Sequence, residues 1–141
     1  MSNILVTGAS GGIGAAICKA LALRGVTVVL HYQSDRAAAE ATRQAMEGVG
    51  HTIIQADLGN PKSIERLWQE AAALQRIDAV VNNAGIFPNH PPLSTDYATW
   101  TAAWQRTLAI NLTGPAHLPI SPRGRWTGAI LDVNGASYLR T

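Results

Sequence analysis

Cysteine, aromatic residues and charge are all scarce in this sequence. Its 141 residues include one cysteine, Cys18, which excludes an internal disulfide and a zinc site built from cysteines and predicts a small packed side chain. Charged residues make up 14% of the chain against 47% hydrophobic residues, a balance that excludes an intrinsically disordered protein. The net charge of +2 is too small to indicate nucleic-acid binding. The histidines show no metal-ligand spacing, so we predict no metal site.

Long apolar runs and internal repeats are missing as well. No window approaches the roughly 20 apolar residues that a membrane-spanning helix needs. The first residues, Met1 to Asn3, lack the basic region of a secretory leader. The length suits one domain with a substantial core. We therefore expect a soluble, cytoplasmic, single-domain protein over residues 1–141.

Short apolar runs alternate along the chain with segments of helical periodicity. The predicted strands are 4–6, 26–30, 52–56, 79–81 and 129–133. Helices are predicted over 13–24 and 97–112. Between them, one helix is capped by Ser34 or Asp35 and runs to 47, and another has Asn60 as its cap and Pro61 in its first position. Residues 113–128 are expected to be irregular, because they contain Pro115, Pro119, Pro122, Gly124 and Gly128. This order predicts an α/β fold with a doubly wound parallel sheet, Rossmann-like, whose ligand crevice lies at the carboxyl ends of the strands.

A glycine-rich turn, residues 7–14 (TGASGGIG), joins the first strand to the first helix. Glycines at this point let the backbone approach a pyrophosphate, and the N-terminus of the following helix favours its negative charge. The alternative is a tight turn that binds nothing.

Three further motifs give the turn a context. Asn82-Asn83-Ala84-Gly85 follows the fourth strand, Asp57-Leu58 follows the third, and Asn111 lies in the last helix. With the T-G-x-x-x-G-I-G spacing, and in this order, the motifs resemble the short-chain dehydrogenase/reductase family, nearest to its ketoacyl-acyl-carrier-protein reductase-like members. The resemblance covers residues 1–118. It resumes at about Trp126, so that 127–141 are similar to the family's last strand and tail.

The resemblance implies a nicotinamide dinucleotide cofactor held mainly by the first half of the chain. The implied contacts are Gly8, Ser10, Gly11, Gly12, Ile13 and Gly14 for the pyrophosphate and adenosine ribose, Asp57 and Leu58 for the adenine, and Asn83, Ala84 and Gly85 for the central ribose region.

The end of the second strand bears on the choice between NADP and NAD. An acid there usually grips the ribose 2′-hydroxyl of NAD, but Leu30 to Ser34 contains none. Ser34 and Arg36, with Tyr32 beside them, are suited to a 2′-phosphate. We therefore predict NADP rather than NAD. Asp35 would favour NAD if its loop curled back, and its alternative role is that of a helix cap.

The sequence also departs from the family. The resemblance implies a catalytic serine and a Tyr-x-x-x-Lys pair after the Asn111 helix, and neither is present in this chain. The tyrosines are Tyr32, Tyr97 and Tyr138, and the lysines are Lys19 and Lys62. The chain thus looks like a member shortened at a junction within 116–126. We expect about five strands in the order 3-2-1-4-5′, with 129–133 docked beside strand 79–81.

Several functions stay open at this point. The first is an oxidoreductase acting on a small carbonyl or alcohol, with Asn111 as a remnant of the proton relay; alternatively, Asn111 only satisfies backbone groups in its helix. The second is a dinucleotide-binding module without chemistry. The third is a subunit that pairs with its own kind or with an intact relative through the Trp100 and Trp104 helix. The fourth is a gene remnant with no function.

Overall fold

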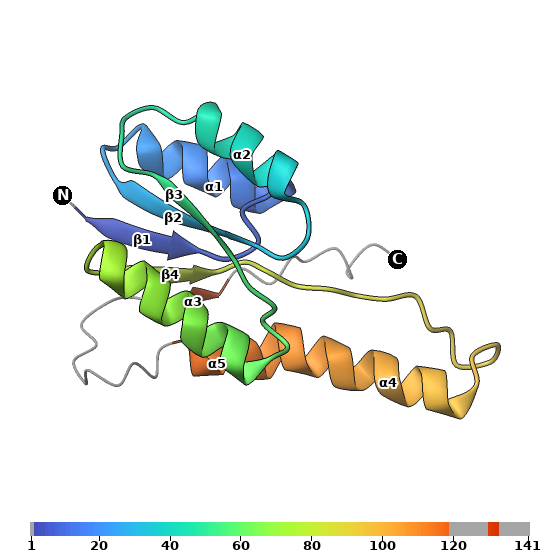
Figure 1. Cartoon of the computed structure of the whole chain (residues 1–141). Coiled ribbons are helices and arrows are strands. Elements are labelled where there is room, and N and C mark those ends of the chain that lie inside the picture. The colour runs from blue at the N-terminus through green and yellow to red at the C-terminus, as the bar shows by residue number, and fades with distance from the viewer. Residues whose placement is uncertain (1, 119–129, 133–141) are drawn as a thin grey trace.

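A parallel β-sheet forms the centre of the computed structural model, which describes residues 2–118 and 130–132 (Figure 1). Its strands are β1 (Asn3–Val6), β2 (Thr27–Tyr32), β3 (Thr52–Gln55), β4 (Ala79–Asn82) and β5 (Ile130–Asp132). They are hydrogen-bonded in the order β3-β2-β1-β4-β5, and every pair is parallel. The predicted doubly wound α/β architecture is confirmed.

Strands β3, β2, β1 and β4 form the body of the sheet, and β5 adds three residues at its edge. Val80 pairs with Ile130 and Asn82 with Asp132, which is the neighbour predicted for the last strand. The rest of the predicted strand, Ala129 and Val133, lies outside the described residues. So do 119–126 of the predicted junction and most of the tail that resembles the family's C-terminus.

Helices cover both faces of the sheet. They are α1 (Gly12–Ala22), α2 (Arg36–Gln44), α3 (Pro61–Leu74), α4 (Tyr97–Leu108) and α5 (Gly114–His117). Figure 1 shows α1 and α2 on one face and α3, α4 and α5 on the other. No helix in the described ranges is long and apolar enough to cross a membrane.

Two helices begin at the caps expected from the sequence. The Asn60 side chain accepts hydrogen bonds from the N–H groups of Lys62 and Ser63, and Pro61 opens α3. The Asp35 carboxylate accepts from the Ala38 N–H at 2.8 Å and caps α2. Of the two roles open for Asp35, the structure therefore has the cap.

Alternate strand residues face opposite sides of the sheet, so both faces carry a core. Leu5, Val29 and Val80 belong to the cluster that packs with α3. Val6 and Val81 belong to the opposite cluster, which includes Cys18 of α1. Burial raises the pKa of the Cys18 thiol to about 12, as expected of a packed, unreactive cysteine.

The prediction for the last helix is wrong at its C-terminus. Helix α4 ends at Leu108, and a π-helical turn, Ala109–Thr113, leads into α5, so the chain is helical through His117 where an irregular segment was expected. The Gly114 N–H donates to the Ala109 carbonyl across the wider turn. Pro115 has no N–H for an α-helical bond to the Asn111 carbonyl, and the wider turn lets the helix continue past it.

Gly114 lies where α5 touches the loop after β3. A Cβ there would be 2.5 Å from the Leu58 carbonyl oxygen and 3.0 Å from the Ala109 carbonyl oxygen. Both contacts are with backbone atoms, which cannot move aside as a flexible side chain would. The close approach of α5 therefore depends on glycine at this position.

Gly114→Ala should lower the free energy of unfolding by about 1–2 kcal/mol, because the clash outweighs the gain in helix propensity of about 1 kcal/mol. Urea unfolding followed by circular dichroism measures this. Ala116→Ser, at an exposed position of the same helix, is the control and should change stability by less than about 0.5 kcal/mol. An alanine variant as stable as the parent would contradict the tight packing.

Candidate dinucleotide site

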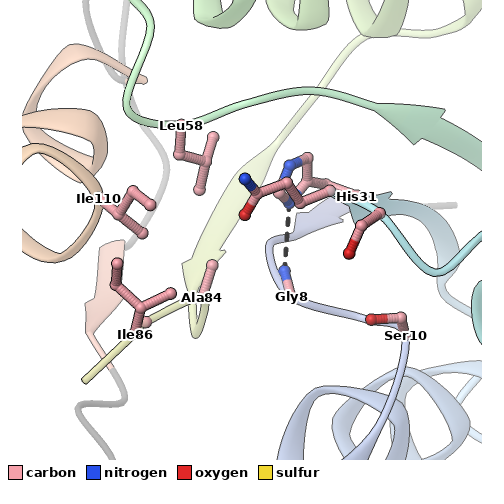
Figure 2. A pocket seen from close by; sticks show the side chains of 10 residues that line it. Gly8, Ser10, His31, Leu58, Ala84, Ile86 and Ile110 are labelled. Atoms are coloured by element: carbon pink, nitrogen blue, oxygen red, sulfur yellow. Dashed lines mark hydrogen bonds between the residues drawn. The ribbon is translucent and has the colours of Figure 1, made fainter. Parts of the chain in front are cut away.

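A pocket of about 210 Å³ opens at the carboxyl ends of the strands (Figure 2). This is the edge at which ligands bind in open α/β sheets. Its lining residues come from the glycine turn, the end of β2, and the segments after β3 and β4, together with the π-helical turn: Gly8, Ser10, His31, Gln33, Ser34, Leu58, Ala84, Gly85, Ile86 and Ile110.

The pocket has an apolar side and a polar side. Figure 2 shows Leu58, Ile86 and Ile110 on one side, with Gly8, Ser10 and His31 on the other. A molecule that joins an aromatic ring to hydroxyl and phosphate groups matches such a division.

Glycine is required at two points of the glycine turn. Gly8 has a φ of +66°, and a Cβ on it would lie 2.9 Å from the Ala84 Cα. A Cβ on Gly14 would lie 2.1 Å from the Gly8 carbonyl oxygen. The turn therefore folds back tightly on α1 and on the segment after β4.

Thr7 and Asn83 connect the two turns through their polar side chains. The Thr7 hydroxyl oxygen accepts hydrogen bonds from the N–H groups of Asn83 and Ala84, each at 3.0 Å. The Asn83 amide donates to the carbonyl oxygens of Thr7 at 2.9 Å and Gly8 at 3.1 Å. The Asn83 side chain, predicted to contact a cofactor ribose, thus bonds the glycine turn.

The N-terminus of α1 faces open space. Gly11 is its N-cap residue and, having no side chain, makes no capping hydrogen bond. Apart from the neighbouring residues of the chain and the backbone of the helix itself, no atom lies within 4 Å of the point where a Cβ of Gly11 or Gly12 would stand. The first N–H groups of the helix and its positive dipole end are therefore accessible to an anion. Ile13, 54% exposed, lies at the same end.

Residues after β2 are divided between the pocket and the core. Gln33 and Ser34 line the pocket, and Arg36 is exposed at the start of α2. Tyr32 is buried, with a 7% exposed fraction, and does not line the pocket. The polar groups that line the pocket at this end are thus those of Gln33 and Ser34. The positive charge of Arg36 follows at the first residue of α2, directly after the Asp35 cap.

Asp57 forms an ion pair with Arg106 of α4. The guanidinium donates two hydrogen bonds to the carboxylate, at 2.8 and 3.1 Å, and the Gly59 N–H donates a third at 2.9 Å. Arg106 holds the pKa of Asp57 below its usual range, and the Gly59 bond acts in the same direction. The carboxylate predicted to face the adenine thus bonds α4, whereas its neighbour Leu58 lines the pocket.

Asn111 lies in the π-helical turn and bonds the segment after β4. Its amide oxygen accepts from the Ile86 N–H and its amide nitrogen donates to the Ile86 carbonyl, both at 2.8 Å. The side chain thus satisfies backbone groups of a segment distant in sequence, whereas the alternative to the relay role expected backbone groups of its own helix.

Six of the predicted cofactor residues meet in the pocket. They are Gly8, Ser10, Ser34, Leu58, Ala84 and Gly85. Those that do not line it are Gly11, Gly12, Ile13, Gly14, Tyr32, Arg36, Asp57 and Asn83. Sequence reasoning missed His31, Gln33, Ile86 and Ile110, although each is next to a residue or motif it had marked. Within the described ranges, no cluster of His, Cys, Asp and Glu is suited to a metal.

Trp100 and Trp104 lie along α4 with their rings tilted by 60° and their ring centroids 6.1 Å apart. Trp104 is 40% exposed, and Leu108 and Leu112 continue the apolar surface. None of these side chains lines the pocket.

A family model for short chain dehydrogenase matches residues 2–120. The sequence is 35% identical over 115 residues to 3beta-hydroxysteroid dehydrogenase 1 of Eggerthella lenta, covering 79% of this chain and 42% of that protein. It is 38% identical over 113 residues to a 3-oxoacyl-[acyl-carrier-protein] reductase of Synechocystis, covering 78% and 44%.

The fold is similar to that of a short chain dehydrogenase from Burkholderia cenocepacia solved in complex with NADP. The TM-score is 0.80 at 30% sequence identity, over 93% of this chain and 54% of that one. The chain thus spans about half the length of the proteins it matches.

Arg106→Gln should raise the pKa of Asp57 towards its ordinary value of about 3.9, because the neighbouring positive charge is lost. A carboxyl pKa lowered by folding stabilises the protein above that ordinary value, and the contribution disappears as the pH falls through the lowered pKa. The loss at neutral pH should stay below about 1 kcal/mol, since the side chains of Arg106 and Asp57 are 39% and 35% exposed.

Carbon-13 NMR titration of the Asp57 carboxyl and urea unfolding at neutral and acid pH measure these effects. Arg66→Gln, which removes the exposed ion pair to Glu70 on α3, is the control and should leave the Asp57 titration unchanged. An unchanged Asp57 pKa in Arg106→Gln would show that the ion pair does not form in solution.

Proposed function

The chain belongs to the short chain dehydrogenase family, and on that premise we propose that it binds NADP(H) as the dinucleotide-binding part of an oxidoreductase. The observation that carries this proposal is the pocket at the carboxyl edge of the sheet, where the glycine turn, the end of β2 and the segment after β4 meet. When bound, the nicotinamide would supply hydride transfer to or from a carbonyl or alcohol carbon.

The residues present fit a dinucleotide. The exposed N-terminus of α1 and the open space at Gly11 and Gly12 suit a pyrophosphate. Leu58 offers an apolar surface to the adenine. Ile86 and Ile110 extend this apolar surface along the pocket. Ala84 and Gly85 leave room beside the glycine turn for the central ribose.

NADP is favoured over NAD by the groups after β2. Asp35, the acid in this segment, uses its carboxylate to cap α2. Ser34 lines the pocket, and the exposed Arg36 guanidinium can pair with a phosphate. The Burkholderia relative with a similar fold was solved with NADP, which supports the same choice.

Cofactor binding without turnover is the activity we expect of these 141 residues. Hydride transfer in the family needs the Tyr-x-x-x-Lys pair, and this sequence contains no such pair. The amide side chains of Asn111 and Asn83, near the pocket, are engaged with backbone partners, Asn111 with Ile86 and Asn83 with the glycine turn. A cytoplasmic location and a pairing partner on α4 stay predictions of the sequence.

Gly11→Leu should weaken NADPH binding at least tenfold while the chain stays folded (an affinity loss of about 1.4 kcal/mol or more). Gly11 has extended backbone with φ −177°, so a side chain is tolerated there, yet it would fill the space meant for the pyrophosphate. NADPH fluorescence titration with circular dichroism measures both effects. Ala16→Leu, at an exposed position of α1, is the control. If the parent chain is folded but does not bind NADPH saturably, the proposed function is wrong.

Arg36→Ala should weaken NADPH binding by about tenfold and leave NADH binding unchanged, because the charge is needed only for the 2′-phosphate. Competitive titration with both nucleotides measures the two affinities. Arg43→Ala is the matched control, since it removes the same charge from the last turn of α2, where Arg43 pairs with Glu40. Equal losses for NADPH and NADH would count against NADP selectivity at this position.

A further inference from the structure

His31 is buried under the glycine turn, and both of its ring nitrogens are engaged. It comes from β2, is 1% exposed and lines the pocket. Its Nδ1 accepts a hydrogen bond from the Gly8 N–H at 3.2 Å, the bond drawn in Figure 2. Its Nε2 lies 3.0 Å from the Ala56 carbonyl oxygen, which only accepts.

These two bonds fit only one form of the ring. Nε2 must carry the hydrogen that goes to the Ala56 carbonyl, and Nδ1 must be bare to accept from Gly8. A proton added at Nδ1 would point at the Gly8 N–H, leaving two donors face to face. The first glycine of the turn would then lose its partner.

The surroundings of His31 act on its charge in opposite directions. Burial lowers the pKa of the imidazole, while the Ala56 hydrogen bond and the Asp57 carboxylate raise it. Asp57, in the segment after β3, is the charged group of the described residues that acts on the His31 ring. Its carboxylate is itself paired with Arg106. The groups that face the ring from the glycine turn and from Ala56 are backbone groups.

We propose that His31 is a positioning residue of the dinucleotide site, whose neutral ring holds the glycine turn in place and whose protonation loosens the turn and weakens NADP binding. The inference rests on the proposed function, because the turn matters only if it carries the cofactor.

Two substitutions separate the two ring nitrogens. In His31→Asn the amide oxygen takes the place of Nδ1 and can accept from Gly8, but it does not titrate. In His31→Gln the longer amide takes the place of Nε2 and can donate to Ala56, while the Gly8 N–H loses its acceptor. The measurement is the NADP dissociation constant of each variant between about pH 8 and about pH 5, with circular dichroism at every pH.

At about pH 8 we expect His31→Gln to bind NADP about tenfold more weakly than His31→Asn. Towards about pH 5 the affinity of the parent for NADP should fall more steeply than that of His31→Asn. The loss should develop below the ordinary histidine value of about 6.5, because burial lowers the pKa of His31. The 2′-phosphate of NADP titrates equally in both measurements, so the comparison of variants removes it. Equal pH profiles for the parent and His31→Asn, or equal affinities for the two variants, would overturn the proposal.

His51 provides a matched control. Its Nδ1 also accepts from a β2 backbone N–H, that of Val28 at 3.1 Å, but at the opposite, amino end of the strand. His51→Asn should therefore keep the parent's pH profile of NADP binding. If His51→Asn instead shows the same pH profile of NADP binding as His31→Asn, the pH effect follows from the loss of any histidine, and the proposal is wrong.

Hydrogen exchange distinguishes this inference from the proposed function. In the chain without nucleotide, protection of the Gly8 amide, corrected for the intrinsic rate, should fall with acid in the parent but not in His31→Asn. If NADP does not bind at any pH, the proposed function is wrong, and the exchange result still decides whether His31 holds the turn. Protection independent of pH in the parent would overturn the role of His31.

Discussion

The close approach of two backbone turns at the carboxyl edge of the sheet is the constraint on which the site depends. Gly8 and Ala84 come so near that a Cβ on Gly8 would lie 2.9 Å from the Ala84 Cα. Thr7 and Asn83 satisfy the backbone groups that this contact removes from water. Because β1 and β4 are neighbours, the two turns meet, and the pocket opens beside them.

Other polar side chains near the pocket serve the same purpose of holding loops. Asn111 bonds both backbone groups of Ile86, and Arg106 ties the Asp57 carboxylate to α4. A buried backbone group without a partner is costly, so irregular segments around a pocket need such side chains. Residues that a motif marks as cofactor contacts can therefore act one step away from the cofactor, by shaping the backbone that touches it.

The fold was largely predictable, and its main miss has a specific cause. Strand 26–30 is β-branched and apolar, and Asn60-Pro61 is a strong helix start, so both were placed correctly within one or two residues. The helical path beyond α4 differs from the prediction, because the prolines and glycines of 113–128 indicate an irregular segment. A π-helical turn lets the helix pass Pro115, and Gly114 lets it lie against Leu58, a contact distant in sequence.

By itself the sequence determined the order of strands and helices, the glycine turn and the family resemblance, since each depends on residues close together in the chain. Only the tertiary structure decided the roles of His31, Asp57 and Asn111. In the sequence no motif marks His31. In the fold, the segment after β1 brings the Gly8 N–H to one ring nitrogen, and the segment after β3 brings the Ala56 carbonyl to the other. Such roles depend on which backbone groups are left without partners when distant segments pack, and neither spacing nor composition contains that information.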